Sequence, residues 1–184
     1  MNPDNKSIQI LRSMVECLED KRLNTLEVLT EGAPVFSFGS VSKSEVATLG
    51  LNPSDKEFYD SKGLELEGEE RRFHTLNSLK ISDWSYANSD VLEKIYTSCE
   101  NYFISNPYDR WFKPLNYIIS GTGYSYYDSF NSACHLDLVP FATKKKWGEL
   151  SSEQRNSLLS IGSQFLAKTL NSGSISLLIL NGKS

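Results

Sequence analysis

Three short apolar runs, each ending abruptly in a turn, constrain the fold of this chain more than any other feature. They span residues 46–51, 134–139 and 176–181. Each run has the length of a buried strand and is too short for a buried helix. The first ends in Gly-Leu-Asn-Pro-Ser, the second at Pro140 and the third in Asn-Gly, all of which are turn sequences. The sequence therefore predicts three buried strands.

The stretches around these strands show the spacing of amphipathic helices. Ile8, Leu11 and Val15 share one helical face, which predicts an opening helix over about residues 5–20. The same spacing recurs over residues 90–103, 111–119 and 151–166. Because strands alternate with helices, the predicted fold is an α/β three-layer α/β/α sandwich with a central, mostly parallel sheet. The length of 184 residues fits one domain over residues 1–184.

Smaller features are also predicted. Residues 35–39 read as a further short strand, and residues 72–76 as the start of a short helix. Two pairs have the spacing of a helix-capping box, namely Asp90 with Glu93 and Ser151 with Gln154.

Composition excludes several classes of protein. No apolar run approaches the roughly 20 residues that span a bilayer, and residues 1–6 lack the pattern of a signal peptide. A soluble, cytoplasmic protein is expected, or a nuclear one in a eukaryotic cell. Three widely spaced cysteines indicate buried thiols. Together with only two histidines, they offer few ligands for a structural metal site. The net charge of −4 argues against a protein that coats nucleic acid, although local basic clusters remain at residues 71–72 and 144–146.

Asn52 is the first candidate for a functional side chain. It follows the first strand directly, and open α/β sheets bind ligands outside the carboxyl ends of their strands. An amide there can orient a water molecule without carrying a charge. Gly50 would let a ligand approach the backbone, and Pro53 would stiffen the loop. An ordinary Asn-Pro turn is the alternative interpretation of these residues.

Four segments, taken in order, extend this interpretation. Residues 50–54 (GLNPS) resemble the Gly-Ile-Asn-Pro-Gly loop of mismatch-specific uracil/thymine DNA glycosylases, and residues 72–74 (RFH) resemble the segment that follows that loop. Residues 135–139 (HLDLV), with Thr143 and the run to Ser152, are similar to a later strand and loop of that family. Residues 180–183 (LNGK) are similar to the end of a further core strand. The chain thus resembles the uracil-DNA glycosylase superfamily over residues 35–184.

This resemblance implies a set of roles. Asn52 would hold the attacking water, and Gly50, Leu51 and Pro53 would border the extruded base. Phe58 or Phe73 would stack on that base. His135 and Asp137 lie two residues apart and so share one face of a strand, from which they would read a pyrimidine edge. The expected phosphate contacts are Ser54, Arg71, Arg72, Lys144, Lys145 and Lys146.

The implied activity is hydrolysis of the bond between uracil, or a related mismatched or damaged base, and deoxyribose in DNA. Neither a metal nor an organic cofactor is expected, the partner is DNA rather than a membrane, and a monomer is the expected state. The chain departs from the family at Ser54, His74 and Asp137, where glycine, tryptophan and asparagine are usual. The family's last motif, a DNA-entering loop, would lie after Ser184, so a C-terminally truncated domain is expected.

Two alternatives stay open at this point. The chain could be a catalytically inactive relative that binds nucleic acid or a protein through the same cleft. It could also be an unrelated α/β enzyme that acts on a nucleotide. The net negative charge, Ser54 and the missing last motif favour the catalytically inactive relative.

Overall fold

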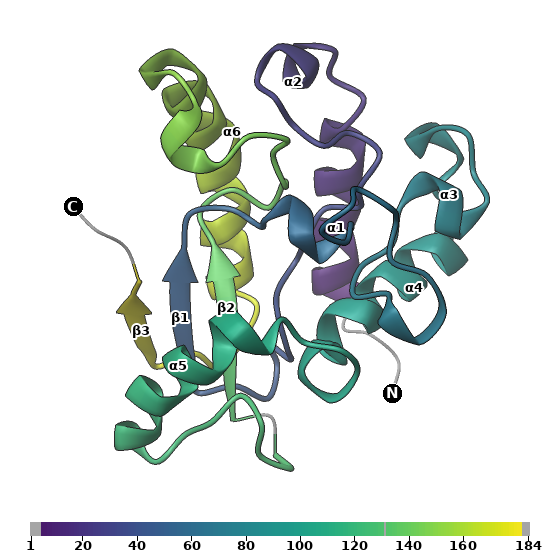
Figure 1. The fold of residues 1–184 in the computed structure, drawn as a ribbon. Coiled ribbons are helices and arrows are strands. Elements are labelled where there is room, and N and C mark those ends of the chain that lie inside the picture. Colours follow the sequence, from purple (N-terminus) through teal and green to yellow (C-terminus); the bar gives the residue numbers. More distant parts are fainter. Residues whose placement is uncertain (1–4, 131, 182–184) are drawn as a thin grey trace.

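A computed structural model describes residues 5–130 and 132–181, and these form an α/β fold around a parallel sheet (Figure 1). The strands are β1 (Val46–Gly50), β2 (Ala133–Asp137) and β3 (Leu177–Leu180), and their order in the sheet is β2-β1-β3. Both neighbours run parallel to β1, which places the carboxyl ends of all three strands at one edge. The register pairs Gly50 with Asp137.

Helices cover both faces of the sheet, which confirms the predicted class. The long helices are α1 (Asn5–Cys17), α4 (Ser89–Glu100), α5 (Asp109–Ile119) and α6 (Ser152–Leu170). Figure 1 shows α5 on one side of the strands and α6 on the other. Alternation along β2 explains this arrangement, because neighbouring strand residues face opposite ways. His135 contacts the ring of Phe112 in α5, whereas Leu136 lies near Phe165 of α6.

Shorter elements connect these layers. Two are single helical turns, α2 (Arg22–Thr25) and α3 (Leu76–Leu79). The others are 3-10 turns: η1 (Asp55–Glu57), η2 (Gly68–Glu70), η3 (Trp84–Tyr86), η4 (Tyr102–Ile104), η5 (Ser120–Thr122) and η6 (Trp147–Glu149). No helix in the described part of the chain is long and apolar enough to cross a membrane.

Two local predictions need correction. Residues 35–39 do not form a strand, because among the described residues they make only one isolated antiparallel β-bridge, between Phe38 and His135. The cap of α4 is Asn88, whose side chain accepts a hydrogen bond from the backbone of Val91, so Asp90 and Glu93 do not cap that helix. An asparagine one position before the helix satisfies one of the free N–H groups of its first turn.

Other local predictions are confirmed. The capping box of Ser151 and Gln154 starts α6 as expected. The three cysteines are free thiols, with Cys99 and Cys134 buried and Cys17 partly so. The predicted truncation and the family resemblance at Gly182 and Lys183 concern residues outside the described ranges.

Candidate functional site

A cavity of about 760 Å³ opens at the carboxyl edge of the sheet. Residues that follow all three strands line it, including Asn52 after β1, Asp137 at the end of β2 and Asn181 after β3. A cavity of this size accommodates a small organic ligand or an extruded nucleobase. Its position is the one that parallel α/β sheets use for ligands.

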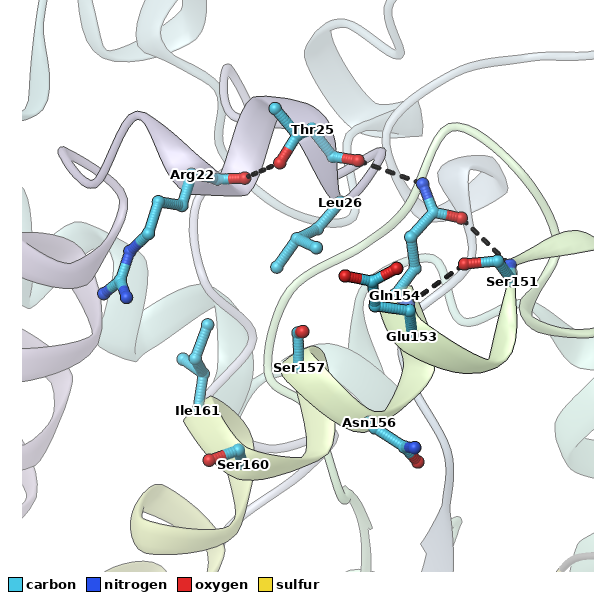
Figure 2. A pocket seen from close by; sticks show the side chains of 10 residues that line it. All are labelled: Arg22, Thr25, Leu26, Ser151, Glu153, Gln154, Asn156, Ser157, Ser160 and Ile161. Carbon is cyan, nitrogen blue, oxygen red and sulfur yellow. Dashed lines mark hydrogen bonds between the residues drawn. The ribbon is translucent and has the colours of Figure 1, made fainter.

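A second hollow, of about 880 Å³, lies between α2 and the start of α6 (Figure 2). Its polar groups already bond to one another. The Gln154 amide donates to the carbonyl oxygen of Thr25 at 2.9 Å, and its oxygen accepts from the backbone of Ser151 at 2.9 Å. Because Ser151 and Gln154 are engaged in capping α6, this hollow offers less chemistry than the cavity at the sheet edge.

The orientation of the Asn52 amide is fixed by its neighbours. Its Nδ2 donates to Thr143 Oγ1 at 2.9 Å and to the Pro53 carbonyl at 3.0 Å. The Thr143 hydroxyl donates its single proton to the carbonyl oxygen of Lys145 at 2.6 Å, so toward Asn52 it can only accept. Nδ2 must therefore face Thr143. Asn52 Oδ1 is left without a protein partner among the residues that the structure describes.

The loop that carries Asn52 is held on both sides. Beyond β1, the backbone N–H groups of Leu138 and Val139 donate to the carbonyls of Gly50 and Leu51, at 3.1 and 3.0 Å. Ser54 caps η1 by accepting from the backbone N–H of Lys56 at 3.2 Å. Leu51, Pro53 and Ser54 all border the cavity, with Leu51 38% exposed at its mouth.

His135 and Asp137 lie on the same face of β2, as predicted, and both line the cavity. His135 Nε2 lies 3.3 Å from Asp137 Oδ1, and because it faces a carboxylate it carries a proton. Nδ1 then accepts from the Thr48 hydroxyl at 2.6 Å, and Thr48 Oγ1 accepts from Tyr126 at 2.5 Å. Hydrogen bonds thus run in one direction from Tyr126 through Thr48 to His135, whose Nε2 faces Asp137.

Gly50 is required by the close packing of these two side chains. A Cβ atom there would overlap Asp137 Oδ1 and approach His135 Nε2 to 2.9 Å. The close approach predicted at Gly50 is that of a ligand, whereas in the structure protein side chains fill that space. Gly50 still borders the cavity.

Gly50→Ala is expected to destabilise the protein by about 1–3 kcal/mol, because the added methyl group must displace buried polar side chains. Urea unfolding monitored by circular dichroism measures this change. Gly121→Ala is the matched control, since nothing lies within 4 Å of its Cβ position, and it should leave the free energy of unfolding nearly unchanged. Equal stability of the two variants would contradict the packing argument.

Glu57 is a site residue that the sequence analysis missed. Its side chain is only 4% exposed although it borders the cavity. Tyr102 donates a hydrogen bond to Glu57 Oε2 at 2.8 Å, and Arg72 Nε lies 4.0 Å from the same oxygen. Burial raises the pKa of this carboxyl to about 7, against the lowering effects of Tyr102 and Arg72, and Asp137 raises it further. At neutral pH Glu57 can therefore give or take a proton.

Of the predicted phosphate contacts, Ser54 and Lys146 border the cavity. Arg72 instead has a structural role, because its side chain is 15% exposed and donates to the carbonyls of Asn106 and Lys56, at 2.8 and 2.7 Å. Lys145 forms an ion pair with Glu27 at 2.7 Å. Arg71 and Lys144 lie outside the cavity lining.

The aromatic wall of the cavity also differs from the prediction. Phe58 and Phe73 are 1% and 2% exposed, pack against each other in the core and do not line the cavity. The aromatic side chains that do line it are Phe38, Tyr108, Trp111, Phe112 and Trp147. Trp111 is half exposed at the rim. These five rings, and not Phe58 or Phe73, are therefore in a position to stack on a ligand.

No protein-family model matches the sequence, and no curated protein matches it significantly. Among the residues that the structure describes, no group of histidine, cysteine, aspartate and glutamate side chains is arranged to hold a metal ion. The site is thus defined by its geometry: an oriented amide, two buried carboxyl groups and an aromatic wall around one cavity.

Proposed function

We propose that this protein hydrolyses the N-glycosidic bond of uracil, or of a related mismatched or damaged base, in DNA. The observation that carries the proposal is the Asn52 amide, which Thr143 turns so that Oδ1 stays free beside an aromatic-walled cavity. The resemblance of residues 50–54 to the water-activating loop of DNA glycosylases agrees with this orientation.

The chemistry follows from the charges that develop during bond cleavage. Asn52 Oδ1 accepts a hydrogen bond from a water molecule and holds it near the sugar C1′ atom. As the bond from C1′ to the base nitrogen breaks, its electron pair moves to the base and positive charge builds on the sugar. Water oxygen then bonds to C1′ and releases a proton. Asn52 is a weak base, so positioning and stabilisation of the departing base supply most of the rate enhancement.

Glu57 can complete the proton balance of this reaction. In its protonated form it can give a proton to the departing base, and the resulting carboxylate can recover a proton from the attacking water. A carboxyl with a pKa of about 7 is present in both forms at neutral pH, which suits a group that must do both.

A base in a duplex has to leave the stack before it can enter this cavity, at a cost of a few kcal/mol that is lower at a mismatch. Trp111, Tyr108 and Trp147 offer apolar surface on which an extruded base can stack. Lys146 supplies a cation at the rim, and no carboxylate pairs with it in the described part of the chain.

The proposal is tested with the purified full-length chain and oligonucleotides that contain one uracil, either single-stranded or opposite guanine. Alkali then converts abasic sites into strand breaks, which gel electrophoresis detects. Strand breaks at uracil would support the glycosylase. Retention of DNA without breaks would favour a binding module, and absence of DNA binding at low salt would favour an enzyme that acts on small molecules.

Lys146→Ala is expected to weaken DNA binding and to lower the slope of log K against log salt concentration by about 1, because one phosphate contact is lost. Fluorescence anisotropy of a labelled oligonucleotide at several salt concentrations measures the slope. Lys145→Ala is the matched control, because the Lys145 ammonium is already paired with Glu27. A larger effect at Lys145 than at Lys146 would place the DNA backbone elsewhere.

A further inference from the structure

The buried floor of the cavity offers mainly hydrogen-bond acceptors. The Asp137 side chain is 4% exposed, and His135 Nε2 is its one ion-pair partner among the described residues. Glu57 Oε2 accepts from Tyr102, while no described residue donates a hydrogen bond to Oε1. Asn52 Oδ1 adds a third oxygen of this kind. Carboxyl oxygens that border a cavity without protein donors can accept hydrogen bonds from a ligand, so a ligand that supplies donors would be favoured here.

The donors nearest to the Asp137 and Glu57 carboxyl groups are held in place by the fold. His135 Nε2 faces Asp137, and the Tyr102 hydroxyl donates to Glu57. The Arg72 guanidinium donates to two backbone carbonyls, and Asn52 Nδ2 donates to Thr143. The Tyr102 hydroxyl and Asn52 Nδ2 therefore cannot turn toward a ligand without breaking an existing hydrogen bond.

We propose that the cavity selects bases that carry an exocyclic amino group next to a ring nitrogen, as cytosine and adenine do, over their keto counterparts uracil and hypoxanthine. The inference rests on the proposed glycosylase function and narrows its substrate to the amino bases, so that uracil, the base suggested by the resemblance of residues 50–54, is expected to be the poorer substrate. An amino group donates to a carboxylate, whereas a keto oxygen at the same place would face the Asp137 carboxylate with no proton between them. The volume of about 760 Å³ admits a pyrimidine or a purine, so hydrogen bonding rather than size makes the selection.

A protonated Glu57 fits the same edge of the base. Its hydroxyl can donate to the ring nitrogen beside the amino group, which is an acceptor in both cytosine and adenine. As the glycosidic bond breaks, the electron pair enters the ring and this nitrogen takes the proton from Glu57. The water that adds to C1′ returns a proton to Glu57, so protons and electrons balance without any further reactant. Uracil carries a proton on the corresponding nitrogen and cannot accept there.

The experiment compares four oligonucleotides that differ only in one mismatched base, either cytosine, uracil, adenine or hypoxanthine. We expect the wild-type protein to excise each amino base at least about tenfold faster than its keto counterpart. Asp137→Asn has nearly the same shape but can donate through its amide, and it is expected to reverse the preference toward uracil. Equal or faster excision of uracil by the wild type would overturn the inference.

Binding of the free bases separates this inference from the proposed function. Cytosine and adenine at millimolar concentration should raise the melting temperature of the wild-type protein more than uracil and hypoxanthine do. This shift requires no catalysis and no folded variant. A cytosine-selective shift in a protein that cleaves no oligonucleotide would support the amino-base site and refute the glycosylase. Equal shifts by cytosine and uracil would refute the selectivity whether or not DNA is cleaved.

Discussion

Asn52→Ala is expected to lower the rate of base excision by about 100-fold or more while leaving the affinity for DNA nearly unchanged. The reason is that Oδ1 would contact the attacking water rather than the DNA backbone, so its loss acts on the chemical step. The Nδ2 group contacts only protein acceptors, which places it outside the path of the substrate. Single-turnover kinetics measures the rate of the chemical step, and fluorescence anisotropy measures DNA affinity.

Two further variants define the origin of this effect. Thr143→Val removes the acceptor that fixes the amide, and we expect a smaller loss of rate because Asn52 Oδ1 is then still present but less well oriented. Asn156→Ala, in the hollow between α2 and α6, is the matched control and should keep the wild-type rate. Equal losses of rate and of DNA affinity in Asn52→Ala would assign the side chain to binding instead of water activation.

Strands β1 and β2 could be predicted from sequence because they are buried and end in turns. Residues 46–51 and 134–139 are mainly apolar for that reason, and both form strands near the predicted bounds. The sequence also predicts a buried third strand, but β3 lies at the edge of the described sheet and its first and last residues are exposed. The position of Asn52 then followed from chain direction alone, since every parallel strand ends at the same edge. The pairing of His135 with Asp137 followed from the two-residue period of a strand.

Glu57 and the aromatic wall could not be predicted in this way. Glu57 stands between Lys56 and Phe58 in a charged stretch, which indicates a solvent-exposed turn. It is buried because Tyr102, 45 residues later, reaches its carboxyl group. Phe58 and Phe73 lie close to the resembling segments, yet they pack into the aromatic core, whereas Trp111 reaches the cavity from α5. Contacts of this range depend on tertiary packing, which local patterns do not encode.

Glu57→Gln is expected to remove a pH dependence of stability that the wild-type protein shows between about pH 4.5 and pH 7. The Glu57 pKa rises from its ordinary value of 4.5 to about 7 in the folded protein. Below pH 4.5 the carboxyl is protonated in both the folded and the unfolded state, and folding carries no penalty. As the pH rises to 7 the unfolded chain ionises first, so the free energy of unfolding falls. The difference in pKa corresponds to about 3 kcal/mol.

A glutamine at this position is uncharged at every pH, so the free energy of unfolding of Glu57→Gln minus that of the wild type should increase by about 3 kcal/mol from pH 4.5 to pH 7.5. Urea unfolding at closely spaced pH values measures it. Glu69→Gln, at an exposed position in η2, is the matched control and should follow the wild-type curve. Because the comparison is between variants, the titration of other carboxyl groups cancels. If the two curves ran parallel over this range, the pKa of Glu57 in the folded protein would equal its ordinary value. Glu57 would then be ionised at neutral pH and could not act as the proton donor to the base.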